Sequence, residues 1–502
     1  MKNKILFLFS LSIFASNPVC SQKHDAKWMM GYSFAPWISF PALDFNYGYA
    51  DTIGYTGYFN IIGASTSICN TQGLLQFYTN GIHVANRLNL PLANSVDFNL
   101  DSYTQGSNSL GIEQCVLTIP EPSSTTKYNL FHIGGTYLSG SIAQPLFLRM
   151  STIDMSLQNG NGQMVVKGQV VLSDTLTYRT MQAVKHGNGR DWWVVIGEYN
   201  SDKFYSALVT AQGIDTIVRS GSGYVNSGGL IRGQSTFSPD GSVYVSTTAN
   251  LATVAENMVN IYYFDRCTGI FTFKDSITFP TSSNSSTTGC AFSPSGQYLY
   301  VNTFIDLFQY DLWSAQFPNN SVHIATYDGF LDFNPVNFYR MQAAPDNKIY
   351  IVPAGATRFL GVINSPNQPD STCNFVQHQL QLISYNYPTI PHFPYYKLGA
   401  SIGSGCDTLL TQGLDPVAFS PDEIVCYYVN NSLHLQFQES LKANLNYSIF
   451  SSNGQLINNG RIKMGTGPNY SINDIGLSSE GLYIIKLWNE EVQFSKKFVV
   501  LD

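Results

Sequence analysis

Charged side chains and long apolar runs are both scarce in this sequence. Only 12% of the 502 residues are Asp, Glu, Lys or Arg, and the formal net charge is −7. Because no basic stripe is present to neutralise phosphates, we expect no nucleic-acid partner. Beyond the amino terminus no stretch approaches the roughly 20 apolar residues that a membrane-spanning helix needs, so we expect no stable membrane span.

Motifs of catalysis and metal binding are missing as well. The sequence has no HExxH motif, no phosphate-binding P-loop and no sialidase Asp-box. Its eight cysteines form no CxxC pair, and no run of closely spaced acidic residues fits a calcium loop. We therefore predict neither a metal nor a cofactor.

The residues that could carry chemistry are scattered. His186 lies in a turn beside Trp192 and Trp193, and a turn histidine usually bonds locally, so no residue is assigned as catalytic. The two tryptophans point to opposite faces of a strand, and we expect one of them to pack between blades. The other either packs in the core as well, which is favoured, or is exposed and stacks on a sugar ring. A glycosidase needs two convergent carboxylates, and the candidates belong to different segments: Asp191, Glu198, Asp240 and Asp306.

What the sequence does contain is a repeated unit of a turn and a strand. Phe237–Ser246 (FSPDGSVYVS) recurs as Phe292–Val301 (FSPSGQYLYV) and as Ala344–Pro353 (APDNKIYIVP). In each copy a Pro sets φ for the first turn position, and a Gly or Asn tolerates positive φ. The residues that follow alternate with the period of two that is typical of a strand.

Related turns recur along the chain at intervals of 51 to 63 residues: Gly73, Thr126, Gly189, Gly241, Gly296 and Asn347. That spacing accommodates four short strands and is typical of propeller blades. A seventh blade-length stretch follows Val352 and ends near Ala400. We therefore predict an all-β, seven-bladed β-propeller at 22–405, closed by a strand at 28–34 against the last blade; six or eight blades, or stacked sandwiches, are the alternatives.

The amino terminus has the pattern of a signal peptide. Two lysines precede the apolar run 5–15, and small residues at 19–21 provide a cleavage site, so we expect residues 1–21 to be removed on export. Export permits disulfides. The favoured pair is Cys267 with Cys290, which flank an expected hairpin; weaker pairs, for which buried free thiols are an equal alternative, are Cys69 with Cys115 and Cys373 with Cys406.

The residue pattern of the sequence changes after an expected linker at 406–418. Short alternating segments at 432–437 and 445–450 are followed by a hairpin turn and by strand-like segments at 481–487 and 494–500. This pattern predicts a small antiparallel β-sandwich at 419–502.

Several motifs of this last domain occur in a fixed order: Tyr447–Phe450, Asn453–Gly454, Ile472–Ile475, Ser479–Ile485 and Lys496–Val500. On these residues the domain resembles the type A C-terminal sorting domain of the type IX secretion system of Bacteroidota. The resemblance implies the type IX secretion machinery as a partner, transport across the outer membrane and removal of the domain. The protein is then expected to be secreted or held on the outer cell surface.

Further motifs lie in the preceding region: Leu43–Asn46, Leu74–Gly81, Val184–Trp193, Phe264–Gly269, Leu360–Pro366 and Ile390–Phe393. Here the chain resembles the propeller-like ectodomains of secreted and gliding-associated Bacteroidota proteins, most of which have no assigned activity. Six tripeptides also fit, or nearly fit, the Asp-Ser/Thr-apolar pattern that these bacteria use for O-glycosylation, with hydroxyls at Thr52, Thr175, Thr216, Ser276, Ser371 and Thr408.

The missing catalytic motifs and the expected export favour a non-catalytic binding protein for an extracellular glycan or protein. Propellers bind through loops at one face near the axis, but the sequence does not identify the ligand-binding residues. The alternatives are a hydrolase or lyase acting on extracellular polysaccharide and a structural component of an adhesion or gliding surface. The fold does not choose among these three roles.

Overall fold

The computed structural model of the protein describes residues 22–32, 39–105, 108–138, 142–225, 231–250, 257–279, 287–401, 403–406, 425–429, 431–437, 444–451, 456–463, 467–473, 475–477, 481–488 and 493–500. The chain divides into two compact units, Met1–Cys406 and Asp407–Asp502. The expected signal peptide at 1–21 and all of the expected linker at 406–418 except Cys406 lie outside the described residues.

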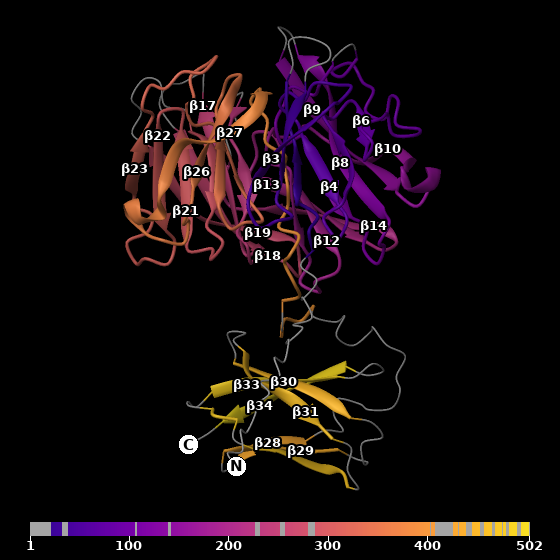
Figure 1. Ribbon diagram of the computed structural model, residues 1–502, viewed down its shortest axis with the longest axis vertical. Helices are drawn as coiled ribbons and strands as arrows, with labels where there is room; N and C mark the ends of the chain where they lie inside the picture. Colours follow the sequence, from indigo (N-terminus) through magenta and orange to yellow (C-terminus); the bar gives the residue numbers. More distant parts are fainter. Residues whose placement is uncertain are drawn as a thin grey trace, which may run out of the picture. The chain divides into compact units, whose positions relative to one another are not determined.

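The first unit consists of consecutive antiparallel sheets, drawn from indigo to orange in Figure 1. The first three sheets contain β1 (Lys27–Met29), β2 (Phe40–Asp44) and β3 (Asp51–Tyr55); β4 (Thr66–Cys69), β5 (Leu75–Thr79) and β6 (Val84–Asn86); and β7 (Val116–Pro120), β8 (Lys127–Leu138), β9 (Ile142–Asp154) and β10 (Gln163–Ser173).

Four further sheets complete the ring. They contain β11 (Gln182–Lys185), β12 (Trp192–Gly197), β13 (Lys203–Thr210) and β14 (Gly213–Gly221); β15 (Ile231–Arg232), β16 (Ser235–Phe237), β17 (Val243–Asn250), β18 (Asn257–Asp265) and β19 (Ile270–Phe279); β20 (Thr287–Phe292), β21 (Tyr298–Thr303), β22 (Asp306–Asp311) and β23 (Val322–Thr326); and β24 (Arg340–Ala343), β25 (Ile349–Val352), β26 (Thr357–Ile363) and β27 (Phe375–Asn386). Two short 3-10 helices are η1 (Gln158–Gly160) and η2 (Asp370–Cys373). The seven sheets confirm the seven-bladed propeller.

Each repeated turn is followed by a strand, as the sequence predicted: in five blades it joins the first two strands, and in the fifth blade it joins β16 and β17. Gly241 and Asn347 have φ of +73° and +63°, the left-handed conformation for which these residue types were singled out. The Ser238 carbonyl accepts the Gly241 N–H (2.8 Å), and the Ser238 hydroxyl oxygen accepts the Val243 N–H (3.0 Å). Each turn therefore closes on its own backbone and places the next strand antiparallel to the first.

The seventh blade is not where the sequence placed it. The stretch after Val352 supplies only β26 and β27, which finish the blade begun by β24. The additional sheet is the amino-terminal one, β1 to β3, whose turn has none of the Ser-Pro signature. The count was right, but residues 387–400 do not form a blade.

The ring closes where the sequence predicted, because the stretch near 28–34 lies against the last blade: the Tyr32 N–H donates to Tyr385 O of β27 (3.1 Å). β1 itself pairs with β2 in its own sheet and adds no strand to the last blade. The chain that follows β27 also returns to the first blades, where the Thr389 hydroxyl donates to Ile61 O (2.9 Å). Both ends of the propeller therefore make closing contacts.

Aromatic side chains fill the space between blades. Between the fourth and fifth sheets, Trp193, Phe237 and Tyr244 share a buried cluster with Phe204 and Phe271, whose rings stack with centroids 4.2 Å apart. Phe237 is the apolar residue that leads the repeated turn. Such ring pairs contribute about 0.5–1.5 kcal/mol beyond their buried area, which explains why this copy of the repeat begins with a large apolar residue.

The second unit contains two antiparallel sheets. One comprises β28 (Val425–Val429), β29 (Ser432–Gln436) and β32 (Asn469–Asn473); the other comprises β31 (Leu456–Ile462), β30 (Leu445–Ser451), β33 (Gly481–Trp488) and β34 (Gln493–Val500). Alternate residues of both sheets share one core, including Leu433, Leu435, Ile449, Ile485 and Leu487. This arrangement is the small antiparallel β-sandwich that the sequence predicted.

Candidate functional site

The chain that follows the last blade occupies the innermost part of the ring. Residues 388–401, here called the closing segment, first run beside β4, where the His392 N–H donates to Ser65 O (2.8 Å). The Tyr396 hydroxyl then donates to Thr118 O on β7 (2.6 Å). Further on, the Ser401 N–H donates to Gly187 O (2.7 Å) in the fourth blade. The segment thus crosses from the first blades to the fourth and covers the axis on the side of the repeated turns.

The remaining space on the axis is small. Residues 393–397 of the closing segment, with the inner strands β11, β16, β20 and β24, line a cavity of about 70 Å³. That volume holds a few water molecules and no sugar ring. Because the protein's own chain occupies the axis, the position at which propellers commonly bind ligands is already filled.

Side-chain amides form hydrogen bonds with the backbone N–H and C=O groups at the free edges of the innermost strands. Gln114 exchanges two hydrogen bonds with the backbone of Ser235, Nε2 to O at 2.9 Å and N to Oε1 at 2.8 Å. Gln234 forms the same pair of bonds with the backbone of Met341. An unpaired buried peptide group costs about 1–3 kcal/mol, so these amides stabilise strands that have no neighbour on the axis.

Four polar side chains from three blades meet beside this region. The Glu113 carboxylate accepts hydrogen bonds from Arg179 Nε (2.8 Å) and from the Tyr339 hydroxyl (2.6 Å), and Arg340 Nη2 lies 3.5 Å from it. Burial raises the pKa of Glu113, but Arg179 and Arg340 outweigh burial and lower the pKa to about 2. The Tyr-Arg dipeptide occurs in both the fourth and the seventh blade, and the fold brings both arginines to one carboxylate.

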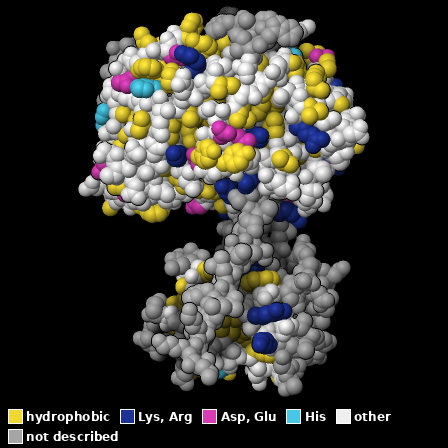
Figure 2. Space-filling view, viewed as in Figure 1, with side chains coloured by type: hydrophobic (Ala, Val, Ile, Leu, Met, Phe, Trp, Pro, Cys, Tyr) yellow, Lys and Arg dark blue, Asp and Glu magenta, His cyan; other side chains and the backbone are white. Residues whose placement is uncertain are grey.

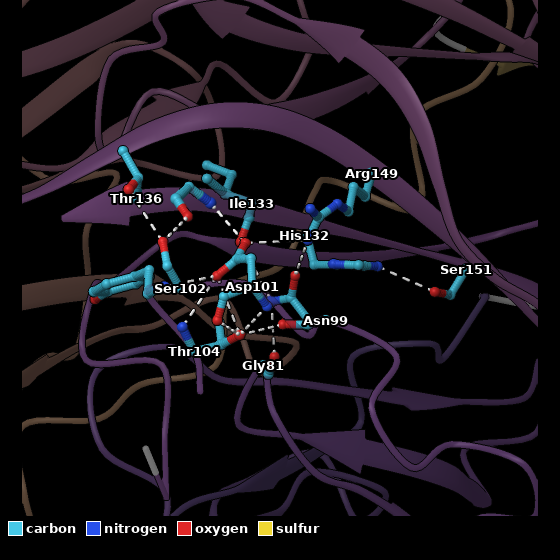
Figure 3. Close-up of polar contacts among 12 residues, drawn as sticks. Gly81, Asn99, Asp101, Ser102, Thr104, His132, Ile133, Thr136, Arg149 and Ser151 are labelled. Atoms are coloured by element: carbon cyan, nitrogen blue, oxygen red, sulfur yellow. Dashed lines mark hydrogen bonds and ion pairs between the residues drawn. The ribbon is translucent and has the colours of Figure 1, made fainter. Parts of the chain in front are cut away.

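A second polar network fastens the loop before the third blade, and Figure 3 shows its members. The Asp101 carboxylate accepts hydrogen bonds from the Gly135 N–H (2.7 Å) and from Arg149 Nη1 (3.1 Å). Asn99 Nδ2 donates to Gly81 O (3.0 Å), which ties the same loop to the second blade. Each of these groups serves a neighbouring backbone or an ion pair, as expected of a structural network.

The network contains a histidine and a serine at the distance of a base and a nucleophile. His132 Nε2 lies 3.1 Å from Ser151 Oγ (Figure 3). Both side chains have no exposed surface, and Ser151 Oγ also accepts the Gly168 N–H (2.9 Å). Burial lowers the pKa of His132 to about 3. A substrate does not reach this pair, so it does not form a catalytic site.

The residues singled out around His186 are engaged in the fold. Its Nε2 donates to Cys267 O (3.2 Å) and its Nδ1 accepts the Asn188 N–H (3.1 Å), so both ring nitrogens are used locally. Trp192 and Trp193 are 0% and 2% exposed. Core packing, the favoured interpretation, is confirmed for both rings, and the alternative of an exposed tryptophan that stacks on a sugar is wrong.

The carboxylates proposed for glycoside hydrolysis do not converge. Each has partners in its own blade: Asp191 with Arg190, Glu198 with Arg219, Asp240 with the hydroxyls of its own turn, and Asp306 with His323. The Gly-x-Ser-x-Gly pattern at 399–403 begins in the closing segment and extends beyond it, and none of its described residues belongs to the strand-to-helix turn that exposes a nucleophile. These positions give no support to the hydrolase alternative.

The predicted disulfide is wrong. Cys267 bonds to Cys406, 139 residues away, with Cα atoms 5.5 Å apart, and not to Cys290. Cys290 lies on the innermost strand β20, where its thiol donates to Gln234 O, whereas Cys267 lies in the turn between β18 and β19 at the rim. The weaker pairs are wrong as well, because the remaining described cysteines of the propeller are buried free thiols: Cys69, Cys115, Cys290 and Cys373.

An open cleft lies on the side of the repeated turns. It has a volume of about 290 Å³ and is lined by turns of the second, third and fourth blades; we call it the turn-face cleft. Thr71, Glu121, Lys185 and Arg190 contribute polar groups to its wall, and Trp192 contributes a ring edge. Three turns far apart in sequence form this cleft, so no local motif could have revealed it.

Lys185 is the most unusual group of the turn-face cleft. Its side chain is only 7% exposed, and its ammonium lies 4.3 Å from the centroid of the Trp192 ring. Burial lowers the pKa of Lys185 to about 8, so the ammonium is still charged at neutral pH. Of its three donors, one points to Arg190 O at 3.4 Å. The ammonium is therefore held in a fixed position from which it can bond a ligand oxygen.

An exposed aromatic pair lies in a loop that contacts the repeated turn of the second blade. Tyr47 and Tyr49 are 70% and 57% exposed, and their rings stack with centroids 6.2 Å apart. Their loop is fixed to the second blade, because Asn46 Nδ2 donates to Gly73 O (3.0 Å), two residues beyond Thr71 of the cleft. The aromatic-rich composition of this stretch is visible in the sequence, but its contact with this turn is not.

The expected glycosylation sites occupy five different blades. Thr52, Thr216 and Ser276 lie on the outermost strands β3, β14 and β19, Thr175 follows β10, and Ser371 lies in η2; none is buried. Thr408 lies outside the described residues.

Among the described residues no three His, Cys, Asp or Glu side chains gather as a metal site requires.

Charged side chains are few and scattered on the propeller face in view in Figure 2. In the part of the chain that the structure describes, no helix combines the length and the apolar character needed to cross a membrane.

Residues 429–501 match the family described as the secretion system C-terminal sorting domain. The chain is therefore an exported propeller protein with a type IX sorting tail, which directs it to the cell surface or outside the cell. No curated protein matches the chain.

Solved structures similar to the chain include a Bacteroides uniformis protein provisionally described as a 6-phosphogluconolactonase (10% identity, 90% of this chain and 100% of that chain covered, TM-score 0.34). Another is Saccharomyces cerevisiae Sqt1 (8% identity, 83% and 94% covered, TM-score 0.35). The propeller assignment rests on the sheets themselves.

Proposed function

We propose that this protein is a non-catalytic binding protein that holds an extracellular glycan in the turn-face cleft. The observation that carries the proposal is the fixed Lys185 ammonium in the wall of an open cleft of about 290 Å³. A charged donor from Lys185 and a carboxylate acceptor from Glu121 in one cleft suit the hydroxyl groups of a sugar.

The exposed Tyr47 and Tyr49 rings extend this surface. Sugar rings present C–H faces that pack on aromatic rings, and a pair of tyrosines fixed to the neighbouring turn offers such a platform. A glycan chain longer than one residue would contact both the platform and the cleft. The filled axis and the engaged carboxylates support binding without hydrolysis.

Delivery follows from the two ends of the chain. The signal peptide at 1–21 directs the chain to the periplasm and is removed there. The domain at 419–502 engages the type IX secretion machinery, and its removal leaves the 22–405 propeller, with the linker at 406–418, released or attached at the surface. O-glycosylation at the six hydroxyls is a separate part of the proposal, and peptide mapping of the secreted protein that finds them all unmodified contradicts it.

A panel of neutral and acidic polysaccharides tests the proposal, with the mature secreted protein assayed for both retention and released products. Lys185→Met should abolish retention, whereas Lys203→Met, on an exposed site of the same blade, should leave it unchanged. Released oligosaccharides would favour the polysaccharide hydrolase or lyase. Retention that is equal in both variants would remove the turn-face cleft from the proposal, and no retention on any glycan would favour a protein ligand.

A further inference from the structure

Arg340 carries a buried cation whose hydrogen-bonding capacity is unused. The side chain is 2% exposed, and its Nε, Nη1 and Nη2 find no acceptor among the described residues. Its charge lies 3.5 Å from Glu113 Oε2, and its guanidinium carbon lies 4.8 Å from the centroid of the Tyr339 ring. A buried guanidinium is strongly disfavoured unless its N–H groups meet acceptors, so the site requires an occupant that supplies them.

A cavity beside Arg340 has room for one small occupant. It has a volume of about 20 Å³, and Arg340, Glu113, Gln114, Gln342 and His392 are among the residues that line it. A cavity that holds one water needs about 10–15 Å³, so this one accepts a water molecule or an ion of similar size. Phosphate, sulfate and carboxylate ligands are too large for it.

The charge of the surrounding side chains selects between these occupants. Arg179 and Arg340 are both cations, whereas Glu113 is the one anion in contact with them. Burial lowers the pKa of His392 to about 4, so its ring adds no charge at neutral pH. The cluster therefore carries one net positive charge in a region shielded from solvent, where an uncompensated charge is costly.

We propose that the cavity beside Arg340 binds a single halide-sized monovalent anion, of which chloride is the representative, and that this anion stabilises the closed ring. Arg340 comes from the seventh blade, Glu113 from the third, and His392 from the closing segment. An anion bonded to the Arg340 guanidinium balances the net positive charge at the point where these parts of the ring meet. Water is the competing occupant, because it would accept from Arg340 and also donate to the unpartnered Nε2 of His392.

Crystals of the secreted protein grown in bromide separate the two occupants, because bromide scatters anomalously and water does not. The expected result is an anomalous peak within hydrogen-bonding distance of the Arg340 guanidinium. An electron-density peak at this position without anomalous signal would overturn the proposal and assign the cavity to water.

Thermal unfolding at constant ionic strength provides a second measurement. Replacing gluconate by chloride should raise the midpoint in the wild-type protein by about 3 °C when chloride is in hundredfold excess over its dissociation constant. Arg358→Met, which changes an exposed arginine paired with Asp332, should keep the full shift, and Arg340→Met should lose it. If Arg340→Met does not fold, the wild-type shift and the bromide peak still decide: equal midpoints in both salts contradict the proposal.

Discussion

Cys406 is bonded to Cys267, so the last described residue of the propeller is attached to the turn between β18 and β19 in the fifth blade. The closing segment is thereby held on both sides. Its start continues from β27 and contacts the first two blades, and Cys406, which follows its end, is fixed by a covalent bond. Every sheet of this ring consists of strands that follow one another in the chain, so no sheet combines strands from the two ends of the chain. The disulfide provides the link that such a shared sheet would otherwise provide.

Removal of the disulfide should therefore weaken the whole propeller. Cys267→Ser combined with Cys406→Ser should lower the free energy of unfolding by about 2–4 kcal/mol, because the bond closes a loop of 139 residues in the unfolded chain. Urea unfolding with and without a thiol reductant measures the difference. The reductant should destabilise the wild-type protein and have no effect on the double variant; equal stability of all four samples would contradict the role of the bond.

Glu113 should be far more important for stability than Glu198, whose partner Arg219 is exposed. Glu113→Gln should lower the free energy of unfolding by about 3–5 kcal/mol, because it leaves Arg179 and Arg340 without their buried anion. Glu198→Gln, which breaks a solvent-exposed pair with Arg219, is the control and should change stability little. Urea midpoints of the two variants provide the comparison, and similar losses would contradict the argument.

Two neighbouring aromatic residues of the closing segment should respond differently to truncation. Phe393 is 6% exposed and packs near the Trp28 ring, so Phe393→Ala should cost about 3–5 kcal/mol. Tyr395 is 40% exposed, so Tyr395→Ala should cost less than about 1 kcal/mol. Thermal unfolding of both variants tests whether the segment is part of the core; equal effects would show that it only lies on the surface.

The propeller should lose stability below pH 6. Burial lowers the pKa of His24, His132 and His392 to about 4, 3 and 4. Near pH 5 these rings are neutral in the folded protein and protonated in the unfolded chain, which opposes folding. Burial raises the pKa of Asp25 to about 6, so this carboxyl is protonated first in the folded protein and acts in the opposite direction.

These three histidines less this aspartate contribute a net uptake of two protons on unfolding between about pH 6 and pH 4, and His83, whose pKa burial also lowers, adds to it. The free energy of unfolding should then fall by at least about 2.7 kcal/mol per pH unit as the pH decreases. Urea titrations at several pH values measure this slope. Asp25→Asn should steepen it by about one proton and His132→Asn should reduce it by one; slopes that do not change in either variant would contradict the assignment.

Glycan binding should weaken at mildly alkaline pH. Burial lowers the pKa of Lys185 to about 8, so its ammonium loses a proton and its charge as the pH rises through this value. Because a charged donor bonds a ligand oxygen more strongly than a neutral amine, affinity should fall several-fold between pH 7 and pH 9. Binding isotherms at three pH values test this, with Lys203→Met as the control that keeps the pH dependence. A constant affinity up to pH 10 would exclude Lys185 as a contact.

The repeated turns could be recognised in the sequence because their chemistry is local. Pro at the first position and Gly241 or Asn347 at the left-handed position are required by the turn itself, whatever surrounds it. The blade that lacks this signature, β1 to β3, was correspondingly missed. The same reasoning explains the disulfide error, since Cys267 and Cys290 are close along the chain but lie at the rim and at the centre of different blades.

The sequence alone determined the all-β class, the propeller architecture, the change of domain and the sorting tail, because period, turn chemistry and the motifs of the last domain are properties of short segments. Only the tertiary structure decided that the closing segment fills the axis, that two arginines share Glu113, and that three turns form the turn-face cleft. Each of these joins residues from different blades, and their distances depend on how the ring closes.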